Sequence, residues 1–309
     1  MDDILKQLKK PRNLVIVLIF AFAFLIIIPQ LDSFKGALNT LDDGSYSYIV
    51  LSTIFTSLTY LFATGVYKSL AFRALSVGRT TIVQLAAMFI NRLLPAGIGA
   101  IGVNYLYLRK NKHTKTQAAS VVAINNFVGG IGHNIIFWIL VFWSGYSVIS
   151  ARKLTNPVGY ILFLGIVCIA AYLLTKLNPK IKSMAKDVLK QLKTYKNHPI
   201  RLSSALFFSI LLTLANVLAL FFAAKAFGIE LDFAKTFIVF TLGVSGGAII
   251  PTPGGLGGFE AGLTAGYIAF GIDKETALAV ALLYRLISYW LTMLCGAGAF
   301  LVALKKKWI

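Results

Sequence analysis

The stretch PTPGGLGGFE, residues 251–260, decides how this chain folds. It holds two prolines, four glycines and one carboxylate in ten positions, and it lies between the apolar segments FIVFTLGVSGGAII and AGLTAGYIAF. Proline removes a backbone donor, and glycine permits left-handed turns and close approach of the backbone. Unpaired backbone groups are costly in hydrocarbon, so an irregular stretch at depth must face protein or a water-filled cavity. We therefore expect a break between two half-helices, with the second beginning near Glu260.

The composition indicates an integral membrane protein. Hydrophobic residues make up 58% of the chain, charged residues 13%, and the mean hydropathy is +0.78, whereas soluble domains carry about 25% charged residues. A spanning helix needs about 17 to 25 apolar residues. We predict an all-α polytopic fold with about six full spans and two Gly/Pro-broken, re-entrant hairpins. The predicted spans are 14–31, 46–72, 116–147, 156–175, 200–226 and 276–303, and the hairpins are 80–110 and 233–270.

The net charge of +19 is concentrated in a few loops and at the ends of the chain. Lys and Arg accumulate on the cytoplasmic side of membrane proteins, so this pattern favours membrane insertion over nucleic-acid binding. It predicts a multi-pass protein of the cytoplasmic (inner) membrane with both termini inside. Residues 176–199 combine lysines with apolar positions and suggest an amphipathic cytoplasmic linker between a first half, 1–175, and a second half, 200–309.

An internal repeat relates the two broken hairpins. LPAGIGAIG (94–102) aligns with TPGGLGGFE (252–260). The aligned positions are Pro95 with Pro253, Gly97 with Gly255 and Gly99 with Gly257, and Pro251 and Gly254 complete the second break. Basic residues flank the first hairpin and weakly charged loops flank the second, so the repeats are predicted to be inverted. Broken segments at matching places in inverted repeats point to a transporter's binding site near the membrane midplane.

Three ionisable residues fall inside predicted membrane segments: Arg92, Glu260 and Arg285. Such residues normally face a cavity or a partner. We expect Glu260 and Arg285 to form an ion pair. Three interpretations stay open, and in the first two the pair only holds the loop to a helix, or the guanidinium also binds a phosphate bidentately. A role for Glu260 alone in proton coupling is a third.

One face of the third span is small and polar, with Asn126, Gly129, Gly130 and His133 at positions i, i+3, i+4 and i+7. Such a face favours either close helix packing or the lining of a cavity. No nucleophile elbow, HExxH motif, Walker loop or pair of carboxylates is present, so we expect no enzyme activity, no cofactor and no metal site. The two cysteines, Cys168 and Cys295, lie in predicted spans and suggest neither a disulfide nor a metal site.

The segment PTPGGLGGFEAGLTAGYIAFGIDKETALAVALLYRLISYW, with NRLLPAGIGAIGVNYLYLRK before it, resembles the flippase-like family called the lysylphosphatidylglycerol synthase transmembrane region. The likeness extends over nearly the whole chain. Members of that family are implicated in moving or handling lipids, among them aminoacylated phosphatidylglycerol, cardiolipin, hopanoids and polyprenyl-linked sugars. The resemblance implies that Pro253, Gly254, Gly255, Gly257, Glu260 and Arg285 form the second-half motif and that Arg92 or its neighbours belong to the first.

The chain departs from the family in its first half, where a glycine followed by Glu and a later charged cluster are replaced by GAIG and INNFVGG. A symmetric charge relay is therefore not expected, and the synthase domain of two-domain relatives is absent from this sequence. The leading hypothesis is a lipid translocase acting on lipids with an anionic headgroup. The alternatives are a non-transporting accessory protein of envelope synthesis and a small-solute transporter. The partners we consider are a second copy of the chain and an envelope-biosynthesis enzyme.

Overall fold

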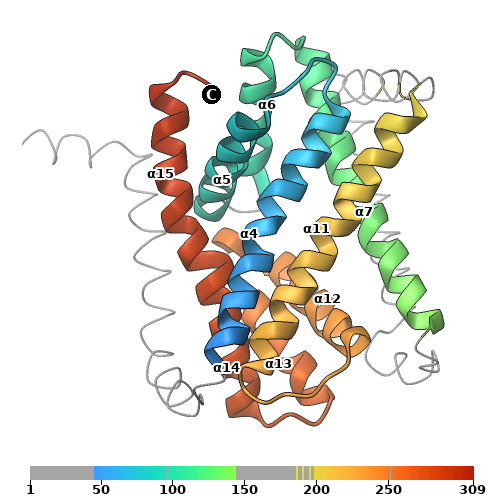
Figure 1. Ribbon diagram of the computed structural model, residues 1–309, viewed down its shortest axis with the longest axis vertical. Helices are drawn as coiled ribbons and strands as arrows, with labels where there is room; N and C mark the ends of the chain where they lie inside the picture. The colour runs from blue at the N-terminus through green and yellow to red at the C-terminus, as the bar shows by residue number, and fades with distance from the viewer. Residues whose placement is uncertain are drawn as a thin grey trace, which may run out of the picture. The chain divides into compact units, whose positions relative to one another are not determined.

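A computed structural model describes residues 45–94, 97–143, 186, 190, 195, 198–250 and 252–309. All the elements within these ranges are helical (Figure 1). The chain divides into two compact units that do not follow the sequence halves. Among the described residues, those within 45–58, 82–103 and 215–308 belong to the first unit, and those within 59–81 and 104–214, together with 309, belong to the second.

The helices have clear bounds. They are α4 (Ser45–Leu70), α5 (Val77–Leu93), α6 (Ile98–Lys110), α7 (Lys115–Trp143), α11 (Pro199–Lys225), α12 (Phe233–Ile249), the 3₁₀ turn η3 (Pro253–Gly255), α13 (Gly258–Ala269), α14 (Lys274–Arg285), the π-helical η4 (Leu286–Leu291) and α15 (Thr292–Lys305). The last three continue into one another as a single helix of 32 residues, Lys274–Lys305 (Figure 1).

The described residues include four helices that are long and apolar enough to cross a membrane. They are α4, α7, α11 and the continuous helix Lys274–Lys305. The prediction of an all-α membrane protein is confirmed at this level, whereas the count of six spans stays a prediction. The predicted spans 14–31 and 156–175 lie outside the described residues, as does most of the linker 176–199.

Both helix breaks lie where the glycine and proline pattern places them. Helix α5 ends at Leu93 and α6 begins at Ile98, while α12 ends at Ile249 and α13 begins at Gly258. The helices that flank the breaks have 17 and 13 residues in the first case and 17 and 12 in the second. Pro95 and Pro251 themselves lie outside the described residues.

In the first unit, α12 and α13 pack through glycines. A Cβ atom on Gly258 would overlap the carbonyl of Gly246, and one on Gly262 would overlap the carbonyl of Leu242. Gly266, one turn further along α13, lies against Val239. Small residues spaced four apart let helix backbones approach closely in a membrane, where packing replaces the hydrophobic effect. This contact fixes the position of the turn between the two helices.

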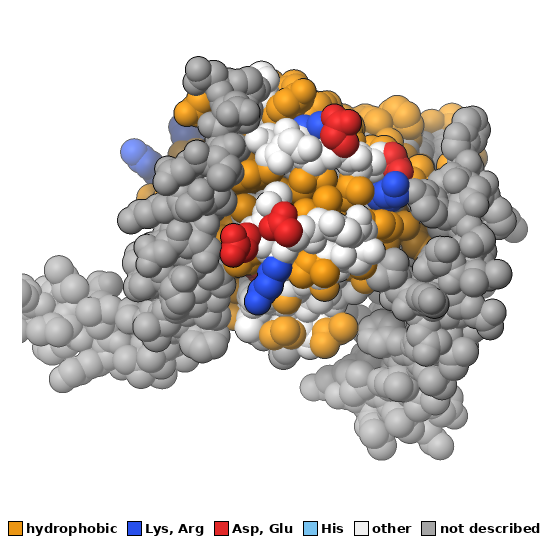
Figure 2. Space-filling model, turned by 90° about the horizontal axis from the view of Figure 1, so that it is seen from below, with side chains coloured by type: hydrophobic (Ala, Val, Ile, Leu, Met, Phe, Trp, Pro, Cys, Tyr) orange, Lys and Arg blue, Asp and Glu red, His pale blue; other side chains and the backbone are white. Residues whose placement is uncertain are grey.

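Charged side chains of both signs lie together on the face shown in Figure 2. The exposed acids of the described residues lie in or beside the turns that precede α12 and α14; they are Glu230, Asp232, Asp273 and Glu275. Glu230 pairs with Lys225 at 3.1 Å, and Asp232 pairs with Lys235 at 3.2 Å. This near balance of charge predicts that these turns lie on the outer side, an orientation that stays a prediction.

In the second unit, polar side chains join neighbouring helices. The hydroxyl groups of Thr64 and Thr81 lie 3.0 Å apart, and those of Thr80 and Tyr107 lie 2.8 Å apart. Ser209 of α11 donates a hydrogen bond to the carbonyl of Val128 of α7 at 3.4 Å. Hydroxyl groups removed from water need such partners, so these bonds fix which helix faces pack together.

Two loops of the second unit meet at His113, between α6 and α7. The Nε2 atom of His113 accepts a hydrogen bond from the backbone N–H of Arg73 at 3.3 Å, and Nδ1 lies 3.1 Å from the carbonyl of Leu108. Burial lowers the pKa of His113, although the hydrogen bonds to backbone carbonyls act in the opposite direction. Tyr195, from the predicted linker, packs beside this loop and donates its hydroxyl proton to the carbonyl of Leu70.

Candidate functional site

The turn between α12 and α13 is built from three glycines with positive φ angles. The φ angles are +60° at Gly254, +70° at Gly255 and +82° at Gly257, a region that side chains with a Cβ rarely adopt. The hydroxyl of Thr252 closes the turn by donating to the carbonyl of Leu256 at 2.7 Å. These three glycines are therefore a geometric requirement of this turn.

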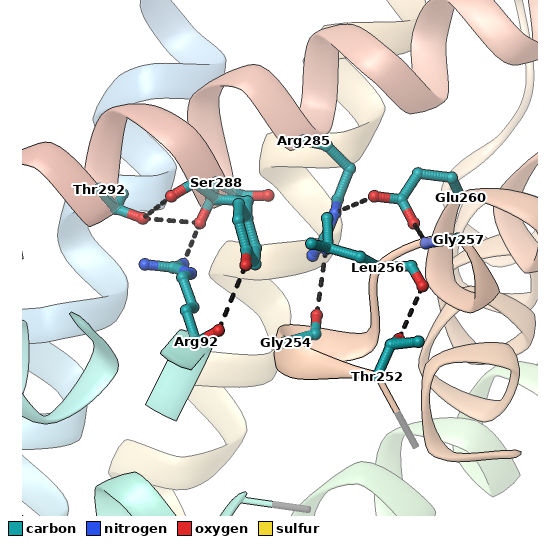
Figure 3. Close-up of polar contacts among 10 residues, drawn as sticks. Arg92, Thr252, Gly254, Leu256, Gly257, Glu260, Arg285, Ser288 and Thr292 are labelled. Carbon is teal, nitrogen blue, oxygen red and sulfur yellow. Dashed lines mark hydrogen bonds and ion pairs between the residues drawn. The ribbon is translucent and has the colours of Figure 1, made fainter. Parts of the chain in front are cut away.

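Glu260 lies in the first turn of α13, and both of its carboxylate oxygens accept hydrogen bonds. Its Oε2 atom accepts the backbone N–H of Gly257 at 2.8 Å, and its Oε1 atom accepts the Nε–H of Arg285 at 2.6 Å (Figure 3). The side chains of Glu260 and Arg285 are each only 9% exposed. The ion pair predicted between these residues is confirmed. Because a carboxylate near a helix N-terminus is also favoured by the helix dipole, Glu260 both caps α13 and neutralises Arg285.

Arg285 also holds the turn directly. Its Nη2 group donates to the carbonyl of Gly254 at 3.0 Å. Its guanidinium lies 4.3 Å from the ring centre of Tyr289 and 5.1 Å from that of Phe259. The two hydrogen bonds use two of the five N–H donors of a guanidinium, and both occupy the edge formed by Nε and Nη2.

Arg92 reaches the same place from the first hairpin. It lies in the last turn of α5, and its Nη2 group donates to the backbone carbonyl of Ser288 (Figure 3). Its guanidinium lies 5.0 Å from the ring centre of Tyr289, whose hydroxyl is 3.4 Å from the carbonyl of Arg92. Tyr289 thus contacts both arginines, and through them the turns of both broken hairpins. We call Arg92, Glu260, Arg285 and Tyr289 the two-arginine cluster.

The cluster lies beside the π-helical segment Leu286–Leu291. A π segment shifts the usual i to i−4 pairing and occurs often at functional sites. Here the backbone N–H of Thr292 bonds to the carbonyl of Tyr289, and the Ser288 carbonyl accepts both Arg92 and the Thr292 hydroxyl. The irregular backbone therefore supplies a polar acceptor in the middle of a long apolar helix.

The two hairpins approach the helix Lys274–Lys305 from opposite ends. Arg92 of α5 lies at Ser288, while Phe89, earlier in α5, lies against Gly296 and 5.7 Å from the ring of Phe300. Helix α5 therefore runs antiparallel to α15. Helix α13 leads in the other direction, from Glu260 beside Arg285 to the turn before Lys274. At 1.5 Å per residue, Tyr289 lies about 23 Å from either end of this helix.

The first hairpin repeats part of the second one's turn geometry. Gly97 has a φ of +75°, close to the +70° of Gly255, the residue with which it was aligned. Gly99 differs from Gly257, because it is helical and is required instead by contact with the backbone of Ile90. The side chain of Asn91 accepts the backbone N–H of Ala100 at 3.3 Å and so caps the start of α6.

The predicted residues Asn126 and His133 belong to the second unit, on α7. Asn126 and Gly130 are exposed and line an open groove of about 690 Å³ together with Asn134, Phe127 and Trp138. His133 is half-buried. The close contact of α7 with α11 runs through Gly132, which lies against Ser209, one residue from the face that the sequence suggested.

One residue of the two-arginine cluster, Tyr289, and the neighbouring Ser288 were not found from the sequence. Tyr289 and Ser288 lie in an apolar run, and neither an aromatic residue there nor a backbone carbonyl gives a signal of its own. The π segment contains no glycine or proline that would indicate an irregular helix in the sequence. The spacing of Gly258, Gly262 and Gly266 could have predicted the packing of α13 on α12.

Comparison with known proteins agrees with the sequence motifs. A family model described as the lysylphosphatidylglycerol synthase TM region matches residues 13–296. The chain is 30% identical over 124 residues to a UPF0104 membrane protein of Methanothermobacter thermautotrophicus, which covers 40% of this chain and 37% of that protein. It is 29% identical over 138 residues to one of Pyrococcus horikoshii, with 41% of each chain covered.

A third relative matches over almost its whole length. This UPF0104 membrane protein of Methanocaldococcus jannaschii is 22% identical over 319 residues, which cover 93% of this chain and 94% of the relative. The two matches of higher identity span about two fifths of the length of the proteins concerned.

Proposed function

The chain belongs to the lysylphosphatidylglycerol synthase TM region family, and from this premise we propose that it is a lipid translocase. It moves an anionic phospholipid or a polyprenyl-phosphate-linked lipid across the cytoplasmic membrane, and it is not an enzyme. The headgroup passes the two-arginine cluster while the acyl or prenyl tails remain in the bilayer.

The observation that carries this proposal is the meeting of two irregular turns halfway along one long helix. Arg92 comes from one turn, Arg285 binds the other, and both contact Tyr289. Buried ionisable residues are expensive in a membrane and usually mark a substrate path. Transporters commonly place their sites between broken helices near the midplane.

An inverted repeat would explain the order of the helices. Long, medium, short and long elements occur twice: α4, α5, α6 and α7, and then α11, α12, α13 and the helix Lys274–Lys305. The medium and short elements differ by no more than one residue between the sets. An inverted arrangement would give the two leaflets equivalent access to the cluster, as a translocase requires.

The arginines suit a phosphate in particular. A guanidinium presents planar, paired donors that match two phosphate oxygens, and it remains charged when it is buried. In Arg285 the aromatic rings of Tyr289 and Phe259 cover the guanidinium, so a ligand must approach one of its edges. A phosphate has the size and charge to do this, whereas a neutral headgroup does not replace the ionic contact.

Reconstitution in proteoliposomes tests the proposal. Purified protein is expected to accelerate the transfer of headgroup-labelled phosphatidylglycerol between leaflets above the rate in empty vesicles. Arg92→Ala and Arg285→Ala are each expected to reduce the rate at least tenfold, because about 1.4 kcal/mol of lost headgroup stabilisation already gives that factor. Arg79→Ala is the matched control, since Arg79 is an exposed arginine near the other end of α5.

If both cluster variants transport at the wild-type rate and at equal protein levels, the phosphate role is wrong. If the wild-type protein moves no lipid above empty vesicles, the translocase proposal fails. The accessory role would then be preferred, and the low exposure of the Glu260–Arg285 pair favours it, because a closed pair can simply hold the turn on the helix. Mass spectrometry of co-purified lipids would identify the bound class in either case.

A further inference from the structure

Glu260 holds one of the two edges of Arg285 on which a guanidinium can bind a phosphate bidentately. The carboxylate accepts Nε–H at 2.6 Å, and the carbonyl of Gly254 accepts from Nη2 at 3.0 Å on the same edge (Figure 3). A bidentate phosphate on Nε and Nη2 must therefore displace both acceptors. With the faces of the guanidinium covered by Phe259 and Tyr289, this edge cannot be shared.

Displacement changes the electrostatics of Glu260. In the described structure its charge is balanced by Arg285, and the side chain is 9% exposed. Once Arg285 is bound to a phosphate, the carboxylate remains buried without its counter-ion. Burial without a partner disfavours the charged form of a carboxyl group. The group is then expected to take up a proton.

Resting on the proposed function, we propose that Glu260 exchanges with the lipid phosphate at Arg285 and is protonated as it leaves, so that headgroup binding is coupled to proton uptake. The ion pair between Arg285 and Glu260 breaks, and an ionic contact between Arg285 and the phosphodiester forms. One proton from water joins the released carboxylate. When the lipid leaves, the proton is released and the ion pair re-forms, so atoms and charges balance over the cycle.

Other titratable groups around Glu260 are few. Arg285 bonds to it from α14, Tyr289 of η4 packs on Arg285, and Arg92 of α5 packs on the ring of Tyr289, whereas Tyr284 stacks on the neighbouring Phe259. Helix α12, which packs along α13, contributes only Lys235 near its start, bound to Asp232. No second acid of the described residues lies in the cluster, so Glu260 is the group expected to take the proton.

A second observation marks a route for the proton. Thr264 and Tyr267 follow Glu260 on α13 at i+4 and i+7, and therefore lie on the same helix face. Their hydroxyl groups are buried without a hydrogen-bond partner among the described residues, and Tyr267 is completely buried. Unsatisfied buried hydroxyls are rare and are often bridged by water. Bridging waters at these hydroxyls would link Glu260 to the turn that follows α13.

The linkage can be measured with a soluble lipid. Dihexanoyl phosphatidylglycerol carries a phosphodiester, which stays singly charged across neutral pH, so any pH dependence belongs to the protein. With wild-type protein in weakly buffered detergent, binding is expected to take up about one proton per lipid and the Kd to fall about tenfold for each pH unit lowered in the coupled range. Glu260→Gln should bind with no proton uptake and no slope.

Tyr267→Phe keeps the ring and removes the hydroxyl. It is expected to preserve the equilibrium slope but to slow proton uptake relative to binding in stopped-flow measurements, whereas Tyr60→Phe, a buried tyrosine of α4, should change neither. Binding by wild-type protein without proton uptake would overturn the inference and leave translocation intact. Absence of both binding and translocation would instead overturn the proposed function. A slope that persists in Glu260→Gln would also exclude Glu260 as the acceptor.

Discussion

Replacement of Gly254 by alanine tests whether the turn positions Tyr289. Gly254 has a φ of +60°, and a Cβ atom there would overlap the ring of Tyr289. A left-handed alanine costs about 1–2 kcal/mol. Forcing extra volume against a packed ring adds about 1–3 kcal/mol. We therefore expect Gly254→Ala to lower the free energy of unfolding by about 2–5 kcal/mol.

Gly257 offers a matched control. Its φ of +82° is also positive, although its ψ of −49° differs from the ψ of 19° at Gly254, and a Cβ atom there meets nothing within 4 Å. Gly257→Ala should therefore lose only a backbone contribution, about 1–3 kcal/mol for a sparsely populated φ/ψ region. Because the two backbone costs differ, the contact with Tyr289 is isolated by its coupling to Gly254→Ala rather than by the difference between the two alanines. Unfolding in mixed micelles, followed by circular dichroism, measures both variants under one set of conditions.

A double-variant cycle completes this test. In a Tyr289→Leu background the ring is gone, so Gly254→Ala should lose about 1–3 kcal/mol less than it does in wild-type protein. Because displacement of Tyr289 disturbs Arg92 and Arg285 together, Gly254→Ala should also slow lipid transfer more than Gly257→Ala does. An absence of coupling between Gly254→Ala and Tyr289→Leu would refute the assignment of Tyr289 as the contact between the hairpins.

Two further predictions concern stability alone. Burial lowers the pKa of His113, so the ring stays neutral in the folded protein at pH values where the unfolded chain, with a pKa near 6.5, already binds a proton. The stabilising contribution of His113 should be present above pH 6.5 and be lost as the pH falls through the lowered folded-state pKa. His113→Phe should remove this part of the pH dependence of melting. Gly262→Ala would place a Cβ atom on the Leu242 carbonyl and should cost about 1–3 kcal/mol, whereas Ala261→Ser, on the exposed face of α13, should leave the free energy of unfolding within about 0.5 kcal/mol.

The sequence predicts the breaks and the ion pair for simple physical reasons. The glycines and prolines at 251–260 disfavour a continuous helix, so a break is expected there. A buried Glu260 needs a cation, and in the predicted membrane segments only Arg92 and Arg285 can supply one. The role of Tyr289 could not be predicted, because its contacts depend on the packing of three segments far apart in sequence. The role of the Ser288 carbonyl could not be predicted either, because every residue has a backbone carbonyl and its use as an acceptor does not depend on the residue type.

The α7 face shows where periodicity alone is insufficient. The pattern at Asn126, Gly130 and His133 predicts a small and polar face, but the groove that includes Asn126 and Gly130 is lined mainly by apolar side chains such as Phe127 and Trp138. The close contact with α11 runs through Gly132, which the i, i+3, i+4, i+7 pattern excludes. Helix periodicity alone therefore does not distinguish close packing from the lining of a groove.

A paired substitution separates a structural role of the ion pair from a transport role. Replacing a buried ion pair by apolar side chains of similar size is often neutral or stabilising, whereas removing one partner costs about 3–5 kcal/mol. Glu260→Met with Arg285→Met should therefore fold, although the carbonyl of Gly254 and the N–H of Gly257 lose partners and offset part of the gain. Glu260→Met alone should melt at a markedly lower temperature, because Arg285 remains charged and buried.

The two roles give opposite expectations for transport by this double variant. If the pair only fastens the turn to the helix, methionines that pack in the same space should preserve lipid transfer. If Arg285 binds the headgroup, transfer should fall to the rate of empty vesicles even though the protein is folded. The exposed pair Lys225–Glu230, replaced in the same way, is the control, since a surface pair contributes about 0–1 kcal/mol and lies outside the cluster. Wild-type transfer by the folded double methionine variant would establish that the pair is structural, and the anion would then have to bind elsewhere.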